Sequence, residues 1–149
     1  MKHSWFRKFL SALLVVSVLF AAAGWLFPCE WKPDEGARFK IAATQVKRDR
    51  SYYWVTVHLR KNGGKNHDME KPVRLVLADS REEMPADTTF AGGQADGTSE
   101  IWFRFWVKEA DLGGPLSLKL NDGTLTVKTS QGVPRIADGM MRTFSNPRW

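Results

Sequence analysis

The side chains best suited to molecular recognition are tryptophans and cations that alternate with apolar residues in two segments. Residues 53–60 read YWVTVHLR and residues 101–108 read IWFRFWVK. Indole rings concentrate in binding interfaces because they bury a large area at low entropic cost, and an arginine stacked on one adds roughly 0.5–1 kcal/mol at an exposed site. We name the outward set the Trp/Arg face, which consists of Trp54, His58, Arg60, Trp102, Arg104 and Trp106.

Catalytic chemistry has little support in the sequence. His67, Asp68 and Glu70 form the only local cluster of metal-ligating residue types, and in the loop KNGGKNHDMEK we expect them to be solvated. Glu82 and Glu83 are adjacent, so in an extended chain they point in opposite directions and are poor acid–base partners. No nucleophile elbow, phosphate loop or dinucleotide fingerprint is present. We therefore predict no enzyme activity, metal site or cofactor.

Period-two alternation predicts that strands carry these side chains. Strands are expected at 38–43, 53–60, 73–77, 101–108 and 116–120, with a last one around Leu125 and Val127. Asn121-Asp122-Gly123 separates the last two and predicts a tight hairpin. The connection 80–99 is too long for a structureless loop, so we expect a short strand at Thr88–Phe90 with Phe90 buried. The pattern predicts an all-β domain, an antiparallel two-sheet sandwich over 38–130.

The succession YYWVTVHLRKNGG, VRLVLADS, IWFRFWV and LSLKLNDGTLTV resembles the immunoglobulin-like domains of unknown function in bacterial membrane-anchored and lipid-anchored proteins. The resemblance covers about residues 38–130 and implies an extracytoplasmic accessory or binding module without known catalysis. The cysteine pair of antibody-type domains is absent, because Cys29 is the single cysteine. In the topology that the resemblance implies, the strands at 53–60 and 101–108 are neighbours, so the Trp/Arg face would form one ladder.

Three interpretations of this ladder remain open. It binds a protein or glycan partner, it packs at the membrane surface, or another part of the chain covers it. The tail 131–149 is a candidate cover because it contains Ile136, Phe144 and Trp149 but too little alternation for a strand, and we expect it to be irregular. Trp31, in the polar linker 30–37, is a second candidate.

Residues 1–29 predict a signal or membrane anchor. Lys2, Arg7 and Lys8 precede residues 9–27, which contain no charge and as a helix would span about 28 Å of the roughly 30 Å hydrocarbon core. This length favours a retained transmembrane helix over a signal peptide cleaved after Ala21-Ala22-Ala23. A third alternative is lipidation of Cys29, since Leu26-Phe27-Pro28-Cys29 resembles a bacterial lipoprotein box with Pro28 as its departure. Cys29 is otherwise an inert thiol or forms an intermolecular disulfide.

The net charge of the outer part argues against a nucleic-acid partner. Three of the 22 basic residues precede Cys29 and all 16 acidic residues follow it, so the outer part has a formal net charge of +3. This mild excess does not predict nucleic-acid binding. We expect a non-catalytic binding or assembly module, attached to the membrane through residues 9–27, with the bulk of the chain periplasmic or at the cell surface. The alternatives are a structural subunit of a larger envelope complex and a secreted or lipid-anchored protein.

Overall fold

The computed structural model describes residues 2–26, 33–92 and 97–149, and its contacts divide the chain into two units, Met1–Lys32 and Pro33–Trp149. The first unit contains helix α1, Lys2–Leu26. Its stretch Ser4–Ala22 is long and apolar enough to cross a membrane, a property that a signal sequence near an N-terminus shares. The possible cleavage site at Ala21-Ala22-Ala23 lies within α1. Phe27, Pro28 and Cys29 of the possible lipoprotein box lie outside the described residues, and so does Trp31.

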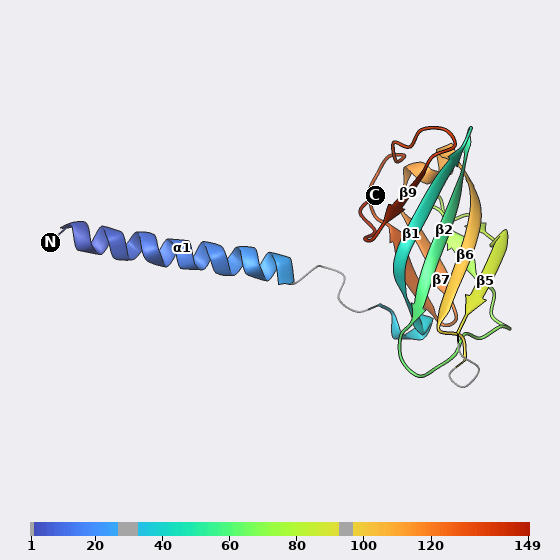
Figure 1. The fold of residues 1–149 in the computed structure, drawn as a ribbon, viewed down its shortest axis with the longest axis horizontal. Coiled ribbons are helices and arrows are strands. Elements are labelled where there is room, and N and C mark those ends of the chain that lie inside the picture. The colour runs from blue at the N-terminus through green and yellow to red at the C-terminus, as the bar shows by residue number, and fades with distance from the viewer. Residues whose placement is uncertain (1, 27–32, 93–96) are drawn as a thin grey trace. The chain divides into compact units, whose positions relative to one another are not determined.

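The second unit is built mainly of β-structure, as the alternation predicts (Figure 1). Its strands and two short 3-10 helices are η1 Glu35–Ala37, β1 Phe39–Asp49, β2 Tyr52–Lys61, β3 Arg74–Val76, β4 Glu82–Glu83, β5 Asp87–Ala91, β6 Glu100–Lys108, η2 Glu109–Gly113, β7 Leu116–Leu120, β8 Gly123–Lys128 and β9 Met141–Phe144. They form two antiparallel sheets, in the orders β5-β6-β2-β1-β9 and β4-β3-β7-β8. Figure 1 shows the first order across the five-stranded sheet.

One hydrophobic core joins the two sheets. Alternate residues of β2 and β6 are buried, and so are alternate residues of the β3 region and of β7 and β8. Fully buried members include Val55, Phe105, Leu75, Leu118 and Phe39. Burying a side chain of this kind contributes about 1.5–3 kcal/mol, so the core must supply much of the stability of a domain without a disulfide. The predicted hairpin at Asn121–Gly123 is confirmed, since β7 pairs with β8 in antiparallel register.

Strand β1 is longer than predicted and its alternation changes phase. The register with β2 shifts between Ile41 and Ala43, which places an extra residue in β1. A β-bulge of this kind exchanges the inward and outward positions that follow it. Thr44 and Val46 are therefore buried, whereas Ala43, expected to face inward, is half-buried. The bulge is the reason that a simple period of two ends at residue 43 although the strand continues to Asp49.

The short strand expected at Thr88–Phe90 is present as β5, but Phe90 is not buried. Its side chain is 40% exposed. Phe90 pairs with Ile101 on the outermost strand of the sheet, so core side chains surround it on fewer sides than a central residue. Its ring stacks instead on His67, at a centroid distance of 6.2 Å.

The C-terminal tail forms part of this unit. The prediction of an irregular tail is wrong for Met141–Phe144, which pair with β1 as strand β9. Ile136 and Trp149 are buried in the common core. The tail therefore extends the five-stranded sheet beyond residue 130 and closes one region of the core.

Candidate binding surface on the five-stranded sheet

The six residues of the Trp/Arg face lie together on the outer side of the five-stranded sheet. In the register of β2 and β6, Trp54 is opposite Trp106 and His58 is opposite Trp102. Arg104 is opposite Thr56 between these two pairs. The intervening residues of both strands are buried, which directs the Trp/Arg face to the outside. The prediction that residues 53–60 and 101–108 form neighbouring strands is thus confirmed.

One half of the face is an aromatic cluster around Trp106. Tyr52 stacks on Trp106 with ring centroids 4.8 Å apart and an interplanar angle of 19°, and Trp54 meets Trp106 edge-on at 4.2 Å. The Arg104 guanidinium lies 4.2 Å from the centroid of the Trp54 ring. Such a cation–π contact contributes about 0.5–1 kcal/mol at an exposed site and limits the rotamers of the arginine. Tyr52 was not predicted, although it falls on the same outward phase as Trp54.

The other half combines a stacked imidazole with a carboxylate. His58 and Trp102 have ring centroids 4.4 Å apart and an interplanar angle of only 4°. His58 Nε2 lies 2.7 Å from Glu100 Oε2, and Arg60 Nε lies 3.8 Å from Glu100 Oε1. Glu100 therefore offsets the positive charge of Arg60 and contacts the His58 ring at this end of the face. Sequence reasoning missed it because the expected strand begins one residue later.

The tail does not cover the Trp/Arg face. Strand β9 lies beyond β1 at the edge of the sheet, and β2 and β1 separate it from β6. Trp54, Trp102 and Trp106 keep partly exposed side chains, with Trp54 against Trp106 and Trp102 against His58. Of the two candidate covers, the tail thus lies at the sheet edge within the described residues, and Trp31 lies outside them.

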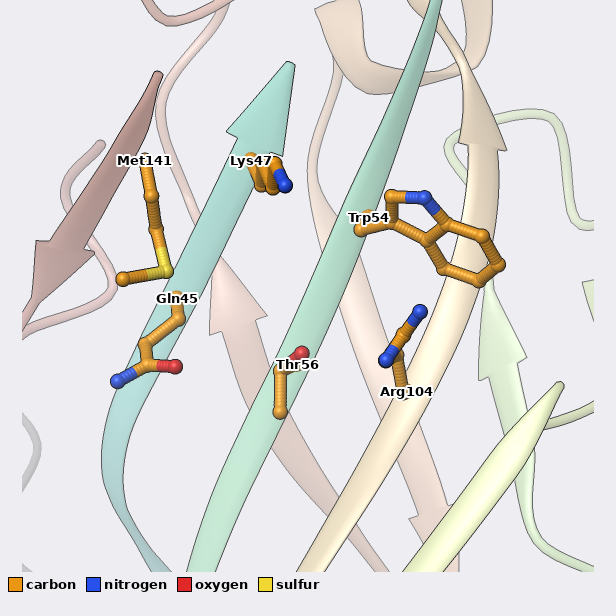
Figure 2. Close-up of a pocket in the computed structure, with 6 residues that line it drawn as sticks. All are labelled: Gln45, Lys47, Trp54, Thr56, Arg104 and Met141. Atoms are coloured by element: carbon orange, nitrogen blue, oxygen red, sulfur yellow. The ribbon is translucent and has the colours of Figure 1, made fainter. Parts of the chain in front are cut away.

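A hollow of about 230 Å³ opens between the aromatic cluster and the tail (Figure 2). Six side chains from four strands line it: Gln45, Lys47, Trp54, Thr56, Arg104 and Met141. The hollow exists because the small Thr56 lies between larger neighbours, with Gln45 opposite it on β1 and Arg104 opposite it on β6. Three lining residues were not predicted. Gln45 and Lys47 follow the bulge in β1, and Met141 belongs to β9, a strand that the sequence did not predict.

His67 packs onto the domain, contrary to the expected solvated loop, whereas Glu70 is exposed as expected. His67 is half-buried, and its ring approaches those of Phe39, Phe90 and Phe103 at centroid distances of 6.0–6.4 Å. Its Nδ1 lies 3.0 Å from Asn121 Oδ1. Within the described residues, no group of three or more His, Cys, Asp or Glu side chains could hold a metal ion. His67 and Asp68 therefore fasten the loop to the β7–β8 hairpin through Asn121.

Burial lowers the pKa of His67 below its ordinary value, despite opposing contributions from Asn121 and Asp68. The unfolded chain then binds a proton near pH 6.5 before the folded protein does, so the free energy of unfolding should fall as pH decreases through this region. Thermal melting at pH 7.5 and pH 5.5 will measure this loss. His67→Asn should reduce the pH dependence, and an unchanged dependence would show that the group responsible lies elsewhere.

No match to this chain was found among protein-family models, curated proteins or solved structures.

Proposed function

We propose that this chain is a non-catalytic binding or assembly module, held at the outer side of a membrane by α1, and that the Trp/Arg face is its contact surface. The observation that carries the proposal is the outward cluster of tryptophan and arginine, which no described segment of the chain covers. Tryptophan, tyrosine and arginine are the residue types that most often dominate binding energy in protein interfaces. A surface of this kind costs solubility unless a partner buries it.

The N-terminal segment supports the proposed location of the module. Helix α1 carries a stretch that can cross a membrane, and the cations Lys2, Arg7 and Lys8 flank its start. Positive flanks remain on the cytoplasmic side, so the β-domain would lie on the opposite side. Retention of the helix is the form we favour, with signal cleavage or lipidation of Cys29 as the other routes to the same compartment. An extracytoplasmic binding domain is also what the immunoglobulin-like resemblance implies.

The arrangement of the β-domain agrees with such a role. Two antiparallel sheets around one core make a rigid support, and its central strands β2 and β6 hold the Trp/Arg face. We infer an immunoglobulin-like sandwich, in which sheet faces and end loops serve as contact surfaces. The partly exposed rings are already ordered by stacking, so binding would restrict few additional rotamers.

Thr56→Tyr tests the proposal with little disturbance of the core. Thr56 lies on the outer side at the centre of the surface, and a tyrosine there would fill the hollow while retaining high β-propensity. We expect at least a tenfold loss of the partner that chemical crosslinking captures in intact membranes, with melting close to that of the parent protein.

Thr126→Tyr is the matched control, because Thr126 is an exposed mid-strand threonine of the four-stranded sheet. It should leave capture unchanged. Equal capture by all three proteins, with the adduct identified by mass spectrometry, would contradict the use of the Trp/Arg face.

A further inference from the structure

Two cations at the hollow lack acidic partners. Lys47 and Arg104 line it from β1 and β6, on either side of β2 (Figure 2). In the described part of the chain neither side chain forms an ion pair, and the only interaction of the Arg104 guanidinium is its contact with Trp54. Arg60, on the same face, is by contrast paired with Glu100. The hollow therefore carries positive charge that the protein does not neutralise with a contact.

Two acids lie beside these cations in the sheet, and in the described structure neither is paired with them. Asp87 is opposite Arg104 on β5, but in the described structure the two side chains form no ion pair, and Asp87 Oδ1 accepts a hydrogen bond from the Thr88 backbone N–H at 2.9 Å. Asp49 follows Lys47 on the same side of β1, and it too forms no ion pair in the described structure. Both cations thus remain available to an incoming anion.

The donors at the hollow suit a carboxylate. The Arg104 guanidinium lies over the Trp54 ring and forms no hydrogen bond or ion pair within the described residues, so its planar N–H groups are free to bind two carboxylate oxygens. Lys47 adds a second charge, and Gln45 and Thr56 add an amide and a hydroxyl. Met141 supplies an adaptable apolar wall. At about 230 Å³ the hollow is smaller than typical small-molecule pockets of roughly 300–1,000 Å³, which favours one side chain of a longer ligand.

The aromatic geometry favours a peptide over a carbohydrate. Sugars bind aromatic residues through an exposed ring face, but each indole here already uses one face or edge on a neighbour. Trp102 stacks on His58, Trp106 stacks on Tyr52, and Trp54 is covered by Arg104. The rings beside the hollow thus have little free area on which a sugar could stack, whereas the two cations, Lys47 and Arg104, remain accessible.

We propose that the hollow between Lys47 and Arg104 binds an aspartate or glutamate side chain of an acidic peptide segment in the partner protein. This inference rests on the proposed function, whose contact surface it makes specific. An extended segment that inserts one carboxylate here would lie across β2 beside the aromatic cluster. Lys47 would attract the carboxylate through its charge, and Arg104 through its charge and through two parallel hydrogen bonds.

The test uses the full chain in a non-ionic detergent and fluorescein-labelled hexaglutamate with an amidated C-terminus, followed by fluorescence anisotropy. Lys47→Gln and Arg104→Gln should each weaken binding about fivefold, the change that corresponds to about 1 kcal/mol for an exposed ion pair. Arg104→Lys should lie between Arg104→Gln and the parent, because the charge remains and the bidentate geometry is lost. Hexaglutamine should not bind.

Lys65→Gln is the matched control, since Lys65 is an exposed cation in the loop after β2 and its removal lowers the net charge equally. It should leave the affinity unchanged when all variants melt with the parent protein. Three results would overturn the inference: no binding of hexaglutamate, equal weakening by Lys65→Gln, or tighter competition by trigalacturonate, an acidic glycan. If one of these occurs while Thr56→Tyr still abolishes membrane capture, only the ligand assignment fails. Unchanged capture by Thr56→Tyr rejects the proposed function itself.

Discussion

Replacing Trp149 by alanine should lower the free energy of unfolding of the β-domain by about 3–5 kcal/mol, the usual cost of removing a buried tryptophan. Only 8% of Trp149 is exposed. Its Nε1 donates a hydrogen bond to the Val127 carbonyl at 3.0 Å, and its ring stacks on Phe144 at 4.9 Å. Alanine would remove both contacts and would free the end of the tail from strands β8 and β9.

The same substitution would expose an unusual buried cation. Lys128 is fully buried and donates hydrogen bonds to the carbonyls of Gly114, Ser130 and Gly132. Its Nζ lies 5.6 Å from the centroid of the Trp149 ring. Burial lowers the pKa of this lysine because it disfavours the charged form. Loss of the indole would admit water to this cation, so part of the destabilisation should be offset.

Chemical denaturation of the purified chain will measure this effect. Arg148→Ala is the control, because Arg148 is the exposed neighbour of Trp149 and its removal should change stability by no more than about 0.5 kcal/mol. If Trp149→Ala has an effect as small as its control, the tail is not part of the core.

Gly123→Ala should be the second most damaging change, at roughly 2–4 kcal/mol for backbone that must move. A Cβ at this position would overlap the backbone N of Ala37 and would lie 2.8 Å from Asp34 Cγ. Gly123 begins β8 directly beneath η1, the first element of the β-domain. The carboxylate of Asp34 accepts hydrogen bonds there from the backbone of Gly36 and Thr124, at 2.9 and 3.0 Å.

The direction of this effect is informative because alanine in place of glycine usually stabilises a compatible position, by about 0.4–1 kcal/mol. Gly64→Ala provides that comparison. Gly64 has no atom within 4 Å of the position of a Cβ, so its replacement should be neutral or slightly favourable. Thermal melting of both variants will measure the contrast. Equal melting temperatures would mean that η1 does not pack against the β7–β8 hairpin as described.

Much of the fold was predictable because its strands are half-buried and alternate cleanly. The inward-facing residues of β2, β6 and β7 are all apolar, so the sequence shows both the period of two and which face of each strand is buried. The prediction was wrong where tertiary contacts override the local pattern. The bulge after Ile41 reverses the phase of β1. Strand β9 has one half-buried residue, Phe144, among exposed ones, so its strand conformation depends on pairing with β1 rather than on alternation.

The candidate surface was predictable in part for the same reason. The Trp/Arg face lies on two regular strands, and an antiparallel pair fixes which outward residues are opposite each other. The hollow was not predictable, since Lys47 reaches it only through the bulged strand and Met141 only through the tail. Likewise His67 reads as a loop residue, and only the fold brings three phenylalanine rings and Asn121 around it.

Photo-crosslinking in intact membranes tests the central claim, that the outer side of the five-stranded sheet is the contact surface, most directly. A photoreactive amino acid replaces Thr89, which is exposed on β5 opposite Trp102 and leaves every residue of the Trp/Arg face in place. The same replacement of Thr126, on the four-stranded sheet, is the reference. The proposed function predicts one reproducible partner adduct from position 89 and none from position 126. Adducts of equal yield from both positions, or none from position 89, would contradict it.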